Sequence, residues 1–192
     1  MDRGDIDIDF ANRDDALLGM NFTMASIISE TEIKKHNTGV YFHQVPIDPV
    51  TSVCSIDYRD AEAAGFFKID LLNVNLYKDV RDEEHLLKLM NTEPNWENLY
   101  DPDFCSKLIH IGNHYSTLIA MPEIVDSIEK MAMLLAVIRP AKKHLIGKTW
   151  DEIKKTVWIK SDDGVYGFHK PHAIGYSHLV VVNMNLLEEN HD

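Results

Sequence analysis

The chain has 192 residues, of which 45% are apolar, enough to build one domain or one domain with a small appendage. Its formal net charge of -12 argues against a protein that coats nucleic acid by itself, because such proteins carry a basic excess. No stretch approaches the ~18 apolar residues of a membrane span, and the acidic first residues do not resemble a signal peptide. We therefore expect a soluble, cytoplasmic protein with no membrane partner, in which Cys54 and Cys105 are free thiols.

Strands are predicted mainly in the first third of the chain. Residues 5–10 alternate strictly between acidic and apolar side chains, which is typical of a strand with one face of each kind. A helix is expected over 12–35, with a break near Asn21. Three further strands are predicted, at 39–44, 51–56 and 65–71.

Helices are predicted in the rest of the chain. The clearest covers 123–138, because a proline precedes it and Arg139-Pro140 follows it. Residues 149–152 resemble a capping box that opens another helix. Three more helical ranges are expected, at 82–90, within 96–111 and at 171–190. Strands followed by helices indicate an α+β fold.

Asp5, Asp7 and Asp9 share one face of the first predicted strand, because strand side chains alternate with a period of two. Aligned carboxylates repel one another, and a divalent cation such as Mg²⁺ would remove that conflict. The alternative is an exposed edge strand that its acidic residues keep soluble. The Asp-x-Asp spacing alone does not decide between these two interpretations.

A third carboxylate, Asp70, lies in the apolar run 66–72, where an acid is costly unless it is paired or binds a metal. Lys68 is two residues away and points to the same side of the predicted strand. It could therefore simply neutralise Asp70.

Three other kinds of site are disfavoured by the sequence. His110 and His114 are four residues apart, but the glutamate of an HExxH zinc motif is missing. Residues 147–149 end like a phosphate-binding P-loop without its upstream glycine. Ser177-His178 lacks the flanking glycines of a hydrolase nucleophile elbow.

Several short segments carry a resemblance to a known family. In chain order they are 5–10 (DIDIDF), 21–25 (NFTMA), 36–40 (HNTGV), 49–51 (PVT), 64–72 (AGFFKIDLL), 138–140 (IRP) and 166–172 (YGFHKPH), with Tyr176 after the last. They are similar to the PDxDIDF, TFGTMA, HAGGV, PVTQ, AGLVKFDFLGL, RPGP and YGFNKSH segments of the bacterial DNA polymerase III alpha subunit. The chain thus resembles the catalytic core of the C-family replicative polymerases over nearly its whole length.

The resemblance implies a palm of the polymerase-beta-like nucleotidyltransferase type, with an antiparallel sheet in residues 1–80 and a helical palm and fingers remnant in 81–192. It implies DNA-directed DNA synthesis with two Mg²⁺ or Mn²⁺ ions, bound by the catalytic residues Asp7, Asp9 and Asp70. Primer-template DNA and deoxynucleoside triphosphates would be the substrates. Nucleotide or phosphate contacts are implied for His36, Lys68, His169, Lys170 and His172.

The chain also departs from the family. Long family segments are absent between Phe10 and His36, and between Pro140 and Tyr166, where an arginine-rich phosphate clamp belongs. Two alternatives to a self-sufficient enzyme therefore stay open. The chain could be a weak or inactive relative that binds a replisome protein, or a second chain could supply the missing parts. So compact a version suggests a bacteriophage or mobile-element gene acting in a bacterial cell.

Overall fold

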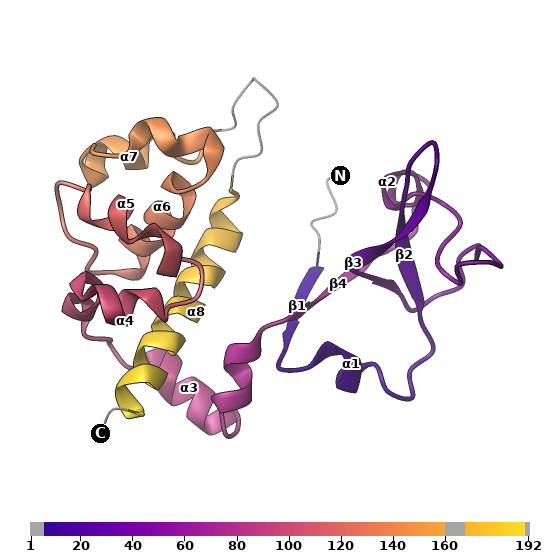
Figure 1. Cartoon of the computed structure of the whole chain (residues 1–192), viewed down its shortest axis with the longest axis horizontal. Helices are drawn as coiled ribbons and strands as arrows, with labels where there is room; N and C mark the ends of the chain where they lie inside the picture. Colours follow the sequence, from indigo (N-terminus) through magenta and orange to yellow (C-terminus); the bar gives the residue numbers. More distant parts are fainter. Residues whose placement is uncertain (1–5, 160–167, 191–192) are drawn as a thin grey trace. The chain divides into compact units, whose positions relative to one another are not determined.

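The computed structural model describes residues 6–159 and 168–190. The fold is α+β, as predicted, and the chain divides into two compact units, Met1–Asp79 and Val80–Asp192. The first unit contains every strand of the described residues, and the second is helical (Figure 1).

A four-stranded sheet with the order β1-β4-β3-β2 forms the first unit. Its strands are β1 (Ile6–Phe10), β2 (Thr23–Ile28), β3 (Ile33–Tyr41) and β4 (Ile69–Asn73). β3 pairs antiparallel with both β2 and β4, whereas β1 and β4 run parallel. The sheet is therefore mixed, and the prediction of an antiparallel sheet is wrong for this pair. A parallel pair needs a long crossover, which the hairpin of β2 and β3 provides together with α2 (Tyr58–Ala63).

Two other local predictions are wrong. The helix predicted over 12–35 is reduced to α1 (Arg13–Ala16), and the following residues form β2. Pairing with β3 overrides the local preference there, since strand formation depends on the neighbouring strand. The strand predicted at 51–56 is only a bridge between Ile47 and Cys54.

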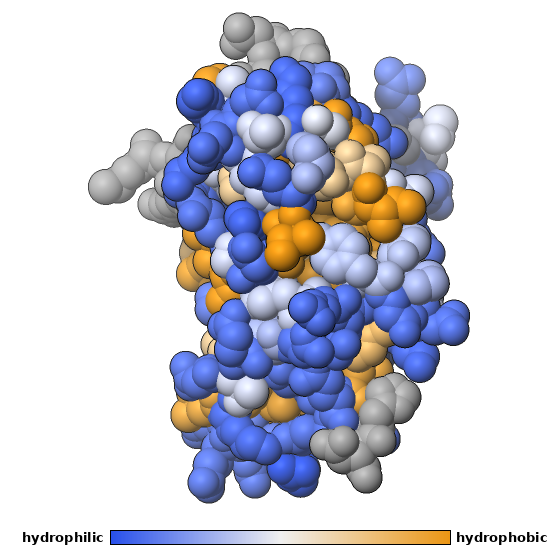
Figure 2. Space-filling view, turned by 90° about the vertical axis from the view of Figure 1, so that its left-hand side faces the viewer, coloured by the Kyte–Doolittle hydropathy of each residue, from blue (hydrophilic) through white to orange (hydrophobic). Residues whose placement is uncertain are grey.

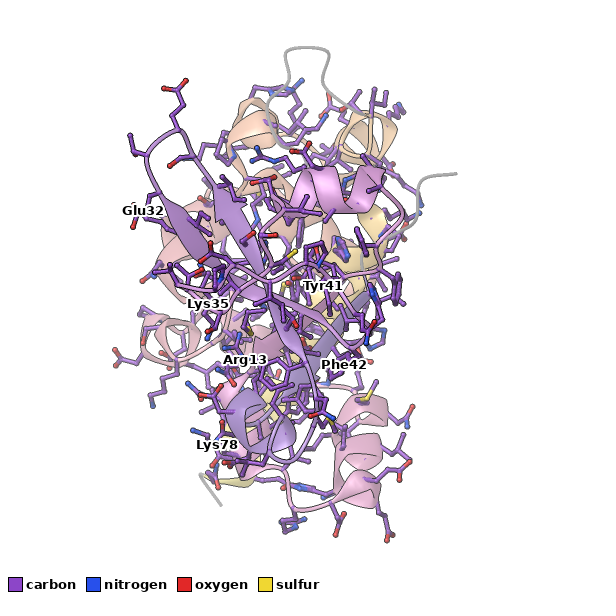
Figure 3. All side chains as sticks on the ribbon, turned by 90° about the vertical axis from the view of Figure 1, so that its right-hand side faces the viewer. Arg13, Glu32, Lys35, Tyr41, Phe42 and Lys78 are labelled. Carbon is purple, nitrogen blue, oxygen red and sulfur yellow. The ribbon has the colours of Figure 1, made fainter. Side chains whose placement is uncertain are left out.

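The two faces of the sheet have different roles. One face packs on a hydrophobic cluster made of Leu17, Met24, Val40, Val53 and Leu71. On the other face Ala25 and Tyr41 pack against Ala61 of α2. Tyr41 is buried at the end of β3, next to the half-exposed Phe42 (Figure 3). The acidic residues of β1 and β4 lie on this second face, because they alternate with side chains of the hydrophobic cluster.

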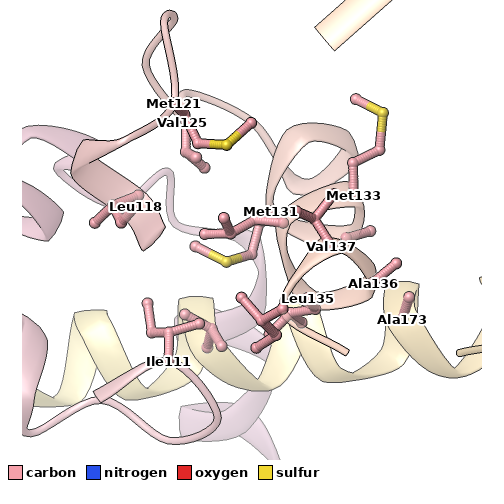
Figure 4. Close-up of a cluster of buried hydrophobic side chains, with 14 of the residues drawn as sticks. Ile111, Leu118, Met121, Val125, Met131, Met133, Leu135, Ala136, Val137 and Ala173 are labelled. Carbon is pink, nitrogen blue, oxygen red and sulfur yellow. The ribbon is translucent and has the colours of Figure 1, made fainter. Parts of the chain in front are cut away.

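The second unit is built around two helices, α6 (Ile128–Val137) and α8 (Lys170–Glu189), which pack against each other. The residues of α6 from Met131 to Val137 are all buried and apolar, so this part of the helix is apolar on every side (Figure 4). Among the described residues, the unit also has four shorter α-helices, α3 (Glu83–Asn91), α4 (Pro102–Ser106), α5 (Tyr115–Ile119) and α7 (Trp150–Thr156), and several 3₁₀ helices. Hydrophilic residues cover most of the face that Figure 2 shows, with apolar residues between them.

Most of the predicted helix boundaries are close to the observed ones. The final helix and the helix at 82–90 are confirmed as α8 and α3. The capping box is also confirmed, since the Thr149 side chain accepts from Glu152 N–H while the Glu152 carboxylate accepts from the Thr149 backbone. The helix predicted from 123 starts later, where Ser127 caps its first turn.

A polar network joins the end of α8 to α3. The Glu189 carboxylate accepts from Lys88 Nζ at 2.5 Å and from His85 Nε2 at 2.9 Å, and Arg81 lies 3.9 Å away. His85 Nδ1 accepts the Arg81 backbone N–H, so the ring proton is on Nε2. The hydrogen bonds from Lys88 and His85 lower the pKa of Glu189 to about 2.

We predict that Glu189→Gln lowers the melting temperature of the protein near neutral pH, because Lys88 and His85 lose their anionic partner. The pKa of Glu189 is lowered by folding, so its contribution is complete above its usual 4.5 and is lost as the pH falls through about 2. Thermal unfolding of both proteins between pH 7 and pH 2 measures this difference. Glu84→Gln, on the exposed first turn of α3, is the control. If the difference in melting temperature between Glu189→Gln and wild type stays constant over this pH range, the lowered pKa of Glu189 is contradicted.

Candidate active site

The sheet brings the predicted acidic residues to one face. Asp7 of β1 is directly opposite Asp70 of β4, and paired residues of neighbouring strands point to the same side. Asp9 lies two residues further along β1 on that same face, opposite Leu72. Asp7 is exposed, Asp9 is half-buried and Asp70 is buried. Asp5 lies outside the described residues.

Asp70 is held by hydrogen bonds to both of its carboxylate oxygens. Lys68 Nζ donates to Oδ2, and the Thr38 hydroxyl donates to Oδ1 at 2.7 Å. Only 8% of the Lys68 side chain and 12% of the Asp70 side chain are exposed, so the two form a buried ion pair. Lys68 therefore neutralises Asp70 here, which is one of the two roles that the sequence allows it.

His36 lies beside this ion pair but does not hydrogen-bond to Asp70. Its Nδ1 accepts the backbone N–H of Gly39 at 2.9 Å, so this nitrogen carries no proton. Its 3.8 Å approach to Asp70 Oδ1 is therefore a contact between two acceptors. The His36 ring packs edge-on against Tyr58 of α2, with the ring centroids 5.0 Å apart.

Tyr58 and Gly39 shape the space that Lys68 occupies. Lys68 Nζ lies 5.9 Å from the centre of the Tyr58 ring, within the range of a cation–π interaction. A Cβ atom on Gly39 would stand 2.7 Å from Lys68 Cδ and 3.0 Å from both Ala25 Cβ and His36 Nδ1. A larger residue at this position would crowd Lys68, Ala25 and His36.

Negative charge is concentrated around Asp9. Burial, and then the charge of Asp7, raise the pKa of Asp9 above its usual value. Burial, and then the charge of Asp9, raise the pKa of the Tyr77 phenol, which lies in the 3₁₀ helix after β4. A bound cation would stabilise the ionised carboxylates of Asp7 and Asp9.

The donor chemistry of Asp7 and Asp9 fits a hard divalent cation, because both present carboxylate oxygens on one strand face. Asp70 is on that face too, but it is turned toward Lys68 and Thr38. Within residues 6–159 and 168–190, no three His, Cys, Asp or Glu side chains are grouped closely enough to hold a metal. To complete a three-carboxylate site, Asp70 would have to lose its hydrogen bond with Lys68 or with Thr38 and bind the metal with the freed oxygen.

The other residues predicted to contact nucleotide or phosphate belong to the second unit. His169 precedes α8, and Lys170 and His172 are in its first turn, with the two histidine rings 6.2 Å apart. The charge of Lys170 contributes, after Lys154, to lowering the pKa of Glu129. Tyr166 and Gly167 of the same motif lie outside the described residues.

Sequence reasoning missed three contributors to the site: Thr38, Tyr58 and Tyr77. Thr38 was inside a segment that carried the resemblance, but its hydrogen bond to Asp70 depends on how β3 pairs with β4. Tyr58 and Tyr77 come from elements that pack on the sheet, and no local pattern identifies their neighbours.

The chain matches no protein-family model, no curated protein and no solved structure. Among the helices of the described residues, none is long and apolar enough to cross a membrane.

We predict that Gly39→Ala destabilises the protein by about 1–3 kcal/mol, because the new methyl group overpacks the space between Lys68, Ala25 and His36. Urea unfolding measures the effect. Gly175→Ala is the matched control, since a Cβ atom there meets nothing within 4 Å. It should be neutral or stabilising, because alanine favours helix more than glycine does. Equal effects of the two substitutions would contradict the close packing around Gly39.

We also predict that Asp9→Asn stabilises the protein at neutral pH without divalent cations. The folded state raises the pKa of Asp9 above 3.8, so its ionised form is unfavourable at higher pH. The gain should be small, on the order of 0.5 kcal/mol, since a half-exposed carboxylate is screened by solvent. It should disappear as the pH falls to 3.8 and below, where the carboxyl group is neutral.

The stability of both proteins, measured by urea unfolding across this pH range, tests the prediction. Asp79→Asn, at an exposed carboxylate of the same unit, is the control. Destabilisation by Asp9→Asn at neutral pH would show that Asp9 has a stabilising partner instead.

Proposed function

We propose that the first unit holds a metal-dependent nucleotidyl-transfer site for DNA-directed DNA synthesis, descended from a C-family polymerase core. The observation that carries the proposal is the strand register, in which Asp7 faces Asp70 on the neighbouring strand and Asp9 follows on the same face. An acidic edge strand that serves solubility alone has no need of a third acid on the buried strand beside it.

In this proposal Asp7 and Asp9 hold Mg²⁺ or Mn²⁺, and Asp70 joins them when Lys68 leaves it. The bound ions would lower the pKa of the primer 3′-hydroxyl and stabilise the pyrophosphate that leaves. Lys68 would then donate to a phosphate oxygen of the incoming deoxynucleoside triphosphate. Tyr58 and Gly39 would keep the lysine directed along the sheet, and Thr38 would continue to orient Asp70.

Within the second unit, His169, Lys170 and His172 at the start of α8 would bind phosphate groups. This helix has 20 residues, and the N-terminus of a long helix favours phosphate groups. Primer-template DNA would be held weakly, because phosphate contacts supply most non-specific affinity and the net charge is -12. We therefore expect slow, distributive and salt-sensitive synthesis.

One observation favours a binding module as the second candidate. Lys68 and Thr38 already satisfy both oxygens of Asp70, so the buried carboxylate is stable without a cation. In that case the acidic face would contact a replisome protein, or a second chain would complete the enzyme.

Primer extension with Mg²⁺ or Mn²⁺ and all four deoxynucleotides tests the proposal. We predict slow extension by the wild type and its loss in both Asp9→Asn and Asp70→Asn. Asp9→Asn is the sharper test, because this variant is expected to be at least as stable as the wild type, and urea unfolding of the same protein checks this. Asp79→Asn should retain activity.

Thermal unfolding provides a readout that does not depend on turnover. Mg²⁺ or Mn²⁺ should raise the melting temperature of the wild type and do little for an Asp7→Asn/Asp9→Asn double variant. Equal shifts in the two proteins would mean that the ions bind elsewhere. Extension that survives Asp70→Asn would indicate a contaminating polymerase. No extension at low salt, with Mn²⁺ and high protein concentration, would favour the binding module.

A further inference from the structure

Both carboxylate oxygens of Asp70 already have partners within the protein. Lys68 Nζ donates to Oδ2, and the Thr38 hydroxyl donates to Oδ1 at 2.7 Å. Asp7 is the Cα partner of Asp70 on the neighbouring strand, and neighbouring strands lie about 4.8 Å apart. Asp70 is therefore beside the Asp7 carboxylate, but it can share a metal with Asp7 only after one of its own partners leaves.

Neither charge of the Lys68–Asp70 pair can lose the other without a penalty. Both side chains are almost fully buried, so water cannot fully hydrate the ammonium or the carboxylate. Removing one partner of a buried ion pair is strongly destabilising, because the remaining charge stays buried without compensation. The pair therefore opens only if each of the two charges receives a new partner.

A cation alone and an anion alone each supply one new partner. If Asp70 bound a metal, the Lys68 ammonium would be left unpaired next to a second positive charge. If Lys68 bound a phosphate group, Asp70 would be left unpaired next to a second negative charge. When both ligands are present, Asp70 exchanges one cation for another and Lys68 exchanges one anion for another. Binding of the two ligands is therefore mutually favourable.

The groups around the pair allow this exchange. The Thr38 hydroxyl bonds to Oδ1, which Lys68 does not use, so it can keep Asp70 oriented when Oδ2 changes partner. Lys68 Nζ lies 5.9 Å from the centre of the Tyr58 ring. A shift toward this ring would keep the ammonium within the roughly 6 Å range of a cation–π interaction.

We propose that the Lys68–Asp70 pair is a latch that makes completion of the metal site depend on the triphosphate substrate. The inference rests on the proposed function and adds the regulation of that same site. In the free protein, a divalent cation has Asp7 and Asp9 as ligands without Asp70. Asp70 releases Oδ2 to the metal only when a triphosphate gives Lys68 a new anionic partner.

Calorimetric titration of the full chain with Mn²⁺, without nucleotide, tests the latch. Lys68→Met removes the ammonium, so Asp70 should join Asp7 and Asp9 with no triphosphate present. We expect Mn²⁺ to bind this variant roughly tenfold more tightly than the wild type, since the number of charged ligands sets the affinity of such sites. The gain should be lost in Lys68→Met/Asp70→Asn.

Two control variants separate the latch from a general effect of charge. Lys78→Met removes the positive charge of an exposed lysine of the same unit and should bind Mn²⁺ as the wild type does. Lys68→Met/Asp79→Asn has the same net charge as Lys68→Met/Asp70→Asn and should keep the tenfold gain. A similar gain in Lys78→Met, or a gain that survives Asp70→Asn, would overturn the latch.

A second measurement avoids Lys68→Met, in which the unpaired Asp70 lowers stability. Equilibrium dialysis counts the Mn²⁺ bound to wild type and to Asp70→Asn, with and without deoxyadenosine α,β-methylene triphosphate. With the analogue at saturation, the wild type should bind one more Mn²⁺ ion than Asp70→Asn. Without the analogue, the two proteins should bind the same number. A difference in both conditions, or in neither, would overturn the latch.

The outcomes also separate the latch from the nucleotidyl-transfer proposal. Mn²⁺ binding that requires Asp7 and Asp9 but is unchanged in Lys68→Met would overturn the latch and leave the metal site standing. The absence of Mn²⁺ binding to the wild type, with and without the analogue, would overturn both.

Discussion

The parallel pairing of β1 with β4 is the constraint on which the first unit depends. It sets Asp7 opposite Asp70, and a shift of one residue would move one strand's acids to the apolar face. Ile8 and Leu71 are paired by the same register, and Leu71 belongs to the hydrophobic cluster beneath the sheet. Burial of the apolar face therefore fixes where the carboxylates point.

The buried ion pair of Lys68 and Asp70 connects stability with the proposed chemistry. Removing one partner of such a pair is strongly destabilising, because the other charge is left buried without compensation. The same lysine would have to leave Asp70 if the carboxylate bound a metal. Glycine at position 39, Tyr58 and Thr38 define the space in which this exchange would occur.

The second unit combines a buried apolar helix with a polar network at the end of α8. α6 is buried along most of its length and ends next to Arg139, so the guanidinium is positioned by a helix that has little freedom to move. At the other end of α8, Glu189 fixes the helix to α3 through Lys88 and His85. The long helix α8 thus supports both the Phe168–Tyr176 stack at its start and the polar network at its end.

The sequence by itself determined the α+β class, the alternation of the first strand, the capping box at 149–152 and the grouping of Asp7 with Asp9. These features arise from neighbouring residues, whose spacing fixes which face they share. Only the tertiary structure decided that β1 and β4 run parallel, that residues 23–28 form a strand, and that Thr38 binds Asp70. The contact between the rings of His110 and Tyr176 also depends on the tertiary structure. Each of these contacts joins segments far apart in the chain, so hydrophobic packing and strand pairing establish it, and no local pattern encodes it.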